Sequence, residues 1–116
     1  MNNNLLSYTE DKARQEYREL VVSGIHKAEA ARQISLKKWT AISEGNTVYY
    51  YHKRCGFCFM AENHYSVICD KCVWMEYLRL FQPRRRWLSC CTGAKRMIKI
   101  FTSNKFREFI DEKGKE

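Results

Sequence analysis

The sequence has no apolar run close to the roughly 20 residues that a membrane-spanning helix needs. Its first residues, Met1-Asn2-Asn3-Asn4, carry neither the basic region nor the apolar region of a secretory signal peptide. It also has no Pro-, Gly- or Ser-rich linker and no internal repeat beyond a pair of C-x-x-C motifs. We therefore expect one compact unit with no membrane partner, in a reducing, intracellular compartment, cytoplasmic or nucleoid-associated.

Motifs that carry catalysis are absent as well. The chain contains neither a G-x-x-x-x-G-K-[ST] phosphate loop nor a G-x-S-x-G nucleophile turn. Asn63-His64 partly resembles the hairpin of an HNH nuclease, but no His or Asn lies between Cys69 and Lys95 to complete that family's metal site. We therefore predict no catalytic residue, no enzyme activity and no small-molecule substrate.

Acidic residues are missing from one long stretch, which runs from Tyr77 to Arg107. The same stretch holds nine of the basic residues of a chain whose net charge is +8, so the rest is nearly neutral: Arg79, Arg84, Arg85, Arg86, Lys95, Arg96, Lys99, Lys105 and Arg107. A localised positive field, interleaved with aromatic side chains, is typical of a nucleic-acid-binding protein. A solvated basic face, or a patch for an acidic protein, is the alternative.

Four cysteines, in contrast, are present at a spacing that indicates metal binding. Cys55, Cys58, Cys69 and Cys72 follow the pattern C-x2-C-x10-C-x2-C. Two C-x-x-C pairs supply the four thiolates of a closed tetrahedral Zn²⁺ site, which leaves no open position for chemistry. We therefore predict one structural zinc ion, a useful supplement to the small core of a 116-residue chain. A redox-active dithiol and an iron–sulfur centre are the alternatives.

Residues 52–82 resemble a treble-clef zinc finger, a class related to the zinc ribbon. The features that carry the resemblance are a first cysteine pair, a ten-residue spacer with Asn63-His64 at a hairpin tip, and a second pair before the helix-forming run 73–81. The resemblance implies a knuckle, a hairpin and a helix, and a rigid platform on which proteins dock. The remaining His and Cys residues have other expected roles: His52 as an alternative ligand or neighbour of the site, His64 exposed, His26 structural at a helix start, and Cys90 and Cys91 as buried apolar residues or one replacement ligand.

The N-terminal part has helical patterns. Ser7 and Glu10 predict a capped helix from Tyr8, with an apolar stripe that ends at Gly24. Helices are predicted over 27–34 and 36–43, and the segment 24–45 resembles a helix-turn-helix with its turn at 34–36. That resemblance implies a second helix anchored by Trp39 and Ile42 that faces the DNA major groove with Lys37, Lys38, Thr40 and Ala41. An ordinary helical hairpin against the zinc module is the alternative.

Basic and apolar segments alternate in the C-terminal part. Arg84, Arg85 and Arg86 suit phosphate contacts, and Trp87 is favoured as a core residue over a base-stacking one. Residues 97–101 form a strand or part of a helix, a choice that periodicity leaves open. Ser103 predicts the cap of a last helix with an apolar face of Phe106, Phe109 and Ile110, followed by a loose tail over 111–116.

Together these patterns predict a small α+β zinc-binding domain. N-terminal helices (1–46) pack on a treble-clef-like knuckle-hairpin-helix module (47–82, entered by a strand over 47–51), and a basic segment (83–116) adds a further helix. The first functional hypothesis is a zinc-stabilised nucleic-acid-binding regulator. DNA is favoured over RNA as its ligand. A compact basic zinc protein of this kind would suit a phage. Its nucleic-acid contacts would come from Arg84, Arg85, Arg86, Lys95, Arg96, Lys99, Lys37 and Lys38. The second is a non-catalytic adaptor or inhibitor that docks on a larger nucleic-acid-processing protein through aromatic residues such as Tyr49, Tyr50, Tyr51, Phe57 and Phe59.

Overall fold

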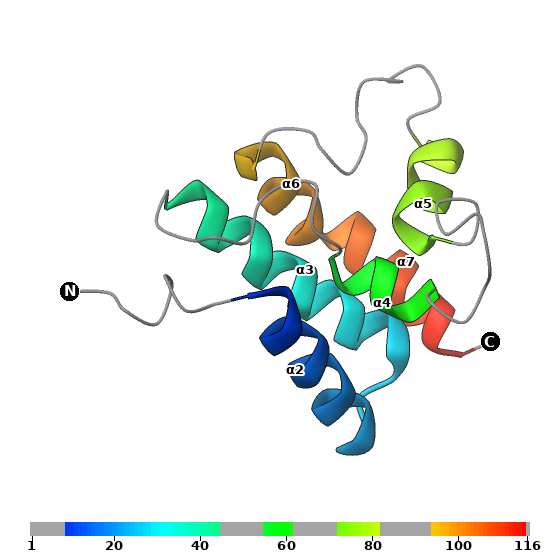
Figure 1. The fold of residues 1–116 in the computed structure, drawn as a ribbon. Helices are drawn as coiled ribbons and strands as arrows, with labels where there is room; N and C mark the ends of the chain where they lie inside the picture. The colour runs from blue at the N-terminus through cyan, green and yellow to red at the C-terminus, as the bar shows by residue number, and fades with distance from the viewer. Residues whose placement is uncertain (1–8, 45–54, 62–71, 82–93, 116) are drawn as a thin grey trace.

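The computed structural model describes residues 9–44, 55–61, 72–81 and 94–115. Every regular element in these ranges is an α-helix (Figure 1): α2 (Glu10–Val22), α3 (Lys27–Ser43), α4 (Gly56–Ala61), α5 (Val73–Phe81), α6 (Ala94–Phe101) and α7 (Asn104–Gly114). Helix α3 runs through the centre, and α2, α4, α6 and α7 all pack against it. The predicted α+β class is therefore wrong: the described helices share one all-helical core.

The predicted zinc hairpin fails because its first half is helical. Helix α4 occupies the positions where the first strand was expected. Gly56, Phe57, Phe59 and Ala61 are all buried in it. A short element that is buried on nearly every side has no clear periodicity, so its sequence does not distinguish a strand from a helix. The hairpin tip at Asn63-His64 and the predicted strand over 47–51 lie outside the described residues.

Helix α2 begins at Glu10, where Thr9 acts as the N-cap and accepts a hydrogen bond from the Lys12 amide at 3.3 Å. The predicted start at Tyr8 is therefore wrong, and Ser7 lies outside the described residues. The predicted apolar stripe is confirmed, since Ala13 and Tyr17 are buried. Leu20 and Val21 pack against the core beside them.

The predicted end of α2 at Gly24 is also confirmed. Gly24 has a φ of +107°, a backbone conformation that favours glycine. Its amide donates to the carbonyl of Val21, and the Ile25 amide donates to that of Leu20, both at 3.1 Å. These two bonds form a Schellman motif, which satisfies the last carbonyls of the helix and turns the chain into α3.

Helix α3 is continuous over 17 residues, so the helix-turn-helix turn predicted at 34–36 is wrong. Ser35, expected to cap a new helix, is fully buried in the middle of α3. Serine is favoured at caps but is tolerated in a helix that tertiary packing stabilises. The packing here is extensive, because the small residues Ala28, Ala30, Ala31 and Ala41 let neighbouring helices approach α3 closely.

An ion pair on α3 is hydrogen-bonded to the end of α6. Arg32 donates to both carboxylate oxygens of Glu29 at 2.8 Å, and its Nη1 donates to the Phe101 carbonyl at 3.1 Å. Burial raises the pKa of Glu29, but hydrogen bonds from Arg32 and Gln33 outweigh it, so the net pKa lies below its usual value. The same pairing raises the pKa of Arg32. Arg32 therefore neutralises a half-buried carboxylate and caps a helix C-terminus at once.

Replacing Arg32 with methionine should lower the free energy of unfolding by about 3 kcal/mol, because Glu29 would be left partly buried without its cation. Chemical denaturation at pH 7 measures this loss. The matched control is Lys37→Met, which removes the exposed Lys37–Glu16 pair (2.6 Å) and should cost under about 1 kcal/mol. Equal losses in the two variants would contradict the assigned role of Arg32.

The same variant has a predicted pH dependence. The lowered pKa of Glu29 adds stability that is present above its unfolded-state pKa of about 4.3 and is lost as the pH falls through the lower folded value. The difference in unfolding free energy between wild type and Arg32→Met should therefore shrink between neutral and acidic pH.

Five rings from four helices build the centre of the core: Phe57, Trp74, Tyr77, Phe101 and Phe106. Trp74 meets Phe101 edge-on with 5.0 Å between ring centroids, and Tyr77 meets Phe106 edge-on at 4.8 Å. Edge-to-face pairs at these separations are favourable beyond the area that they bury. The predicted helix over 73–81 is confirmed as α5, although Leu80 near its end is 59% exposed.

The C-terminal residues form two helices, which settles the open choice over 97–101 in favour of a helix. Ser103 caps α7 as predicted and accepts from the Phe106 amide at 3.3 Å. Phe106 and Ile110 are buried, and Phe109 packs beside them. The predicted loose tail is wrong up to Gly114, because α7 continues to that residue and Lys113 forms an ion pair with Glu76 of α5.

Candidate metal centre

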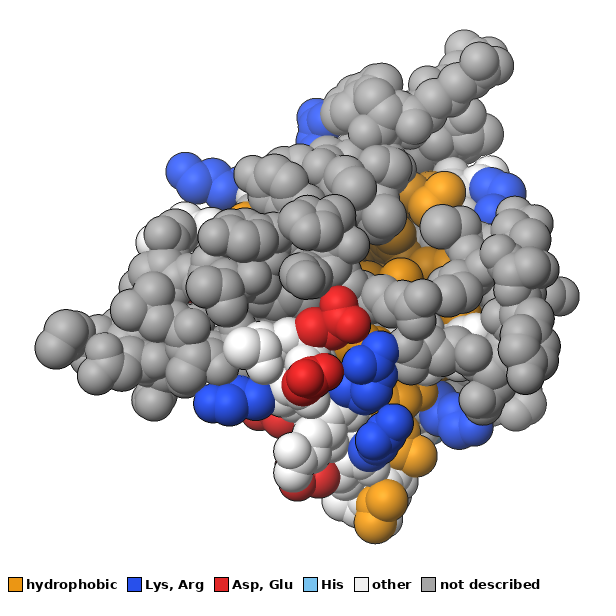
Figure 2. Space-filling view, in the orientation of Figure 1, with side chains coloured by type: hydrophobic (Ala, Val, Ile, Leu, Met, Phe, Trp, Pro, Cys, Tyr) orange, Lys and Arg blue, Asp and Glu red, His pale blue; other side chains and the backbone are white. Residues whose placement is uncertain are grey.

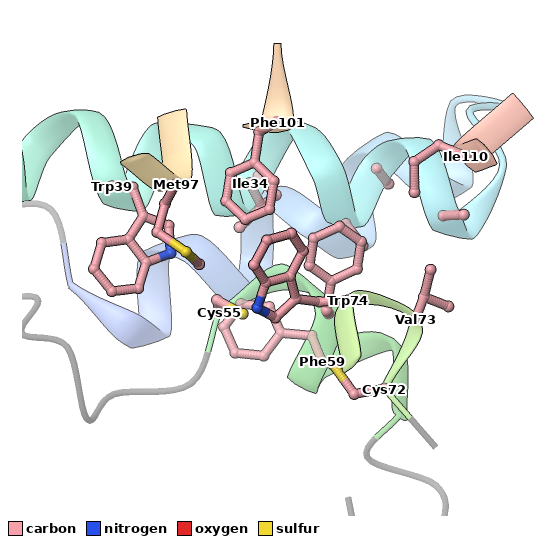
Figure 3. Close-up of a cluster of buried hydrophobic side chains, with 14 of the residues drawn as sticks. Ile34, Trp39, Cys55, Phe59, Cys72, Val73, Trp74, Met97, Phe101 and Ile110 are labelled. Carbon is pink, nitrogen blue, oxygen red and sulfur yellow. The ribbon is translucent and has the colours of Figure 1, made fainter. Parts of the chain in front are cut away.

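Three of the four predicted zinc ligands lie in the described residues, and two of them immediately precede helices. Cys55 stands before α4 and its carbonyl accepts from the Phe59 amide, while Cys72 stands before α5 and accepts from the Glu76 amide. Both are buried. Figure 3 shows their sulfur atoms at the starts of the two helices, with Phe59 and Trp74 between them in this view. Cys69 lies outside the described residues.

The first cysteine pair occupies the first turn of α4. Cys55 is the residue before the helix and Cys58 is its third residue. At this spacing the amide of Cys58 points toward the Cys55 side chain, as in an N-cap. The predicted zinc knuckle is therefore wrong at this point: the C-x-x-C residues form the first turn of a helix, in which the Cys58 thiol hydrogen-bonds to that of Cys55.

A close contact between backbones fixes this turn against α3. A Cβ atom placed on Gly56 would lie 2.9 Å from the Cα of Ala31, and closer still to its carbonyl oxygen. Only glycine fits between the two helices at this point. Ala31 therefore lies where α3 and α4 cross. Through Gly56, the α3–α4 contact sets the position of Cys55.

The pKa values of the two thiols are shifted in opposite directions. A hydrogen bond from the Cys58 thiol lowers the pKa of Cys55 against the opposing effect of burial. The positive charge of Lys38, the Ser35 hydroxyl and the Cys58 amide lower it further. The same hydrogen bond, burial and the charge on Cys55 raise the pKa of Cys58, and Cys72 adds to this. Cys55 is thus the thiol that is ready to bind as a thiolate.

Sequence reasoning missed the role of α3 in this site. Lys38 was assigned to DNA, but it is 1% exposed and its charge acts on Cys55, so it is not available to nucleic acid. Ala41, on the same predicted groove face, is buried too. The spacing of Ala31, Ser35 and Lys38, at i, i+4 and i+7, predicts one shared helix face. That signal was lost once a turn was placed at Ser35.

The chemistry of this donor set suits zinc. Thiolates are preferred ligands of structural Zn²⁺, and each must lose its proton to bind. Within the described ranges no three Cys, His, Asp or Glu residues are close enough to hold an ion. The thiols of Cys55 and Cys58 do touch, and Cys72 lies within electrostatic reach of Cys58. A metal shell would therefore need Cys72 to draw closer and Cys69 to supply the fourth thiolate.

The remaining residues singled out by the sequence take no part in the cysteine site as far as the structure describes them. His26 is structural as predicted: it caps α3, and its Nδ1 accepts from the Glu29 amide at 3.2 Å. His52, His64, Cys90 and Cys91 lie outside the described residues. Phe57 and Phe59, predicted to serve in docking, are buried in the core.

The predicted nucleic-acid contacts divide into three groups. Lys95, Arg96 and Lys99 are exposed on α6. Lys37 is half exposed and pairs with Glu16 of α2. Arg84, Arg85 and Arg86 lie outside the described residues. Of the predicted set, the described structure brings together only the α6 residues on one exposed face.

Comparisons with protein-family models, with curated proteins and with solved structures give no match to this chain. Among the described helices, none is long and apolar enough to cross a membrane.

Proposed function

We propose that this protein is a zinc-stabilised nucleic-acid-binding protein that contacts phosphates through α6. The observation that carries the proposal is the exposed basic face of that helix, formed by Lys95, Arg96 and Lys99. The helix contains no acidic residue. Lysine and arginine side chains that face solvent together on one helix attract the phosphate backbone.

The core holds this basic face in a fixed position. Met97 and Phe101, on the other side of α6, are 1% and 0% exposed. The Phe101 carbonyl accepts from Arg32, which ties the end of α6 to the central helix. Phe101 also packs on Phe57 of α4 at 5.8 Å between ring centroids, in the helix that carries Cys58. A metal at the cysteines would therefore stabilise the packing that presents α6.

Charges elsewhere on the described surface are mixed. Figure 2 shows acidic and basic side chains side by side over α2, where Arg14 pairs with Glu10 and Asp11 at 3.5 and 3.8 Å. Alternating charges of this kind form ordinary solvated surface and produce no directed field. The contrast supports α6 as the binding face.

Changing the three basic residues of α6 together to glutamine should weaken binding to duplex and single-stranded probes and flatten its salt dependence. Each phosphate contact contributes about 0.9 to the slope of log K against log salt on duplex DNA, so the slope should fall by about 2 to 3. Fluorescence anisotropy over a salt series measures both. Parallel titrations with DNA and RNA probes of the same sequence decide which of the two is the better ligand.

A matched control removes the same charge elsewhere: Lys12→Gln, Arg18→Gln and Lys27→Gln, all at exposed positions on α2 and α3. This control should leave the slope nearly unchanged. If both triple variants weaken binding equally, the effect is net charge alone and α6 is not the interface. If the wild type binds no probe, the nucleic-acid function is rejected.

A second candidate function, docking on a larger protein, is supported by the end of α5. Leu80 and Phe81 are 59% and 43% exposed there. The Nζ of Lys105 lies 4.4 Å from the centre of the Phe81 ring. Exposed aromatic and aliphatic groups with a nearby cation are typical of protein interfaces. A partner that stays bound after nuclease treatment and is lost in Phe81→Ser would favour this function.

A further inference from the structure

Phe81, the last residue of α5, has a ring that the core holds but does not cover. The residue is 43% exposed. Its ring meets the buried Tyr77 ring at 5.0 Å between centroids and the Phe109 ring edge-on at 6.0 Å. Tyr77 in turn packs edge-on against the fully buried Phe106 at 4.8 Å. The Phe81 ring is therefore fixed to the core on one side and accessible from solvent, an arrangement that suits a flat partner.

Basic side chains lead from α6 to this ring. Lys99 is exposed in the last turn of α6, and Lys105 is exposed in the first turn of α7. Only a tight turn separates them (Figure 1), in which the Oγ of Ser103 donates to the last turn of α6 at 2.7 Å. The Nζ of Lys105 lies 4.4 Å from the centre of the Phe81 ring, and Arg79 is exposed in the last turn of α5. The basic face of α6 thus continues to an exposed aromatic ring.

We propose that Phe81 is a base-stacking platform and that the ligand of this protein is a single-stranded nucleic acid. The inference rests on the proposed nucleic-acid function and extends it to the class of nucleic acid that is bound. Unpaired bases stack on an aromatic side chain through their flat faces, while lysine and arginine contact the phosphates between them. The bases of a duplex are stacked on one another inside the helix and do not reach such a ring.

Lys105 changes its contact when a strand binds in this way. In the free protein its ammonium group lies over the ring, where a base would stack. An exposed cation–π contact changes an equilibrium constant by about 2- to 5-fold, whereas a base stacked on an aromatic side chain changes it by about 5- to 150-fold. Stacking is the stronger interaction, so the base takes the place over the ring. The long side chain of Lys105 then turns to the phosphate beside that base.

The test compares Phe81→Leu, which keeps an apolar side chain but removes the ring, with Phe81→Trp, which keeps a ring. The probes are one oligonucleotide as a single strand and as a duplex, with binding measured by fluorescence anisotropy. Phe81→Leu should bind the single strand about 5- to 150-fold more weakly and bind the duplex as the wild type does. Phe81→Trp should restore the single-strand affinity. The salt dependence should be the same in all three proteins, because neither substitution removes a charge.

A second single strand that contains 2-aminopurine reports stacking directly, because this base loses fluorescence when it stacks. The wild type and Phe81→Trp should quench its emission, and Phe81→Leu should not. Leu80→Ala is the matched control, since it removes an exposed apolar side chain from the adjacent position. It should keep the wild-type affinities and the wild-type quenching.

The inference is overturned if Phe81→Leu binds the single strand as tightly as the wild type, or if Leu80→Ala weakens binding equally. It is also overturned if Phe81→Leu weakens duplex and single-strand binding to the same extent, or if it loses only a nuclease-resistant protein partner. Each of these results leaves the phosphate contacts of α6 to be judged by the triple glutamine variant. If the wild type binds neither probe, the proposed function itself has failed.

Discussion

Replacing Cys55 with serine should abolish stoichiometric zinc binding and remove the cooperative unfolding transition. Structural zinc sites contribute about 10–16 kcal/mol of apparent binding free energy, which matches or exceeds the 5–15 kcal/mol that stabilises a typical domain. Cys55 is the buried member of the pair, and its backbone begins α4. A serine there would lose the ligand and leave the Cys58 thiol without its hydrogen-bond partner. Metal analysis and thermal unfolding followed by circular dichroism measure the two losses.

The control for this experiment is Cys91→Ala, at a cysteine outside the C-x2-C-x10-C-x2-C pattern. It should keep one zinc ion per chain and a cooperative transition. Cys72→Ser should behave as Cys55→Ser does, because both residues are proposed as ligands of one ion. If Cys55→Ser and Cys72→Ser keep the metal, the zinc ligands have been assigned incorrectly.

Replacing Gly56 with alanine should destabilise the protein by about 3 kcal/mol or more, although it adds a single methyl group. The new Cβ would overlap the backbone of Ala31, and a backbone cannot rotate aside as a side chain can. Helix α4 would have to move away from α3 and carry Cys55 and Cys58 with it. We therefore also expect weaker zinc binding, measured by competition with a chromophoric chelator.

Gly24→Ala is the matched control for that substitution. No atom lies within 4 Å of a Cβ at Gly24, so its cost comes only from the positive φ, about 1–2 kcal/mol. Zinc affinity should be unchanged, since Gly24 ends α2, away from the cysteines. If Gly24→Ala is the more damaging of the two, the close α3–α4 contact is not what positions the metal site.

Local patterns predicted the ends of several helices. Gly24 ends α2, Ser103 caps α7, and the run from Val73 to Phe81 is a helix, each for the reason that the sequence offered. These features depend on residues a few positions apart, so the sequence contains the whole interaction. The stripe of α2 is of the same kind, because Ala13 and Tyr17 lie one turn apart.

The α+β class and the helix-turn-helix were predicted incorrectly because each rested on a local preference that tertiary packing overrode. Ser35 is a good cap by its chemistry, yet α3 passes through it because alanines on either side allow α4, α6 and α7 to pack closely. Treating the C-x-x-C motif as part of a zinc-finger family led to a hairpin at residues that form α4 instead. The cysteine spacing itself is compatible with a helical turn as well as with a knuckle.

The candidate site, too, was predicted from the sequence only in part. The spacing of the cysteines identified three residues whose thiols or charges interact. It gave no indication of Lys38, because a lysine between Lys37 and Trp39 resembles an exposed basic run. The structure shows instead that its side chain is buried and that its charge lowers the pKa of Cys55. Whether a charged residue is buried depends on tertiary packing, which a single sequence does not contain.

The central claim is that one zinc ion, bound by cysteines at the starts of α4 and α5, stabilises the helical core. The most direct test is native mass spectrometry of the purified full chain before and after incubation with a strong chelator, with thermal unfolding recorded on the same two samples. We predict one zinc ion per chain before chelation, and loss of both the ion and the cooperative transition afterwards. A chain that is purified without metal and unfolds at the same temperature with or without chelator would contradict the account.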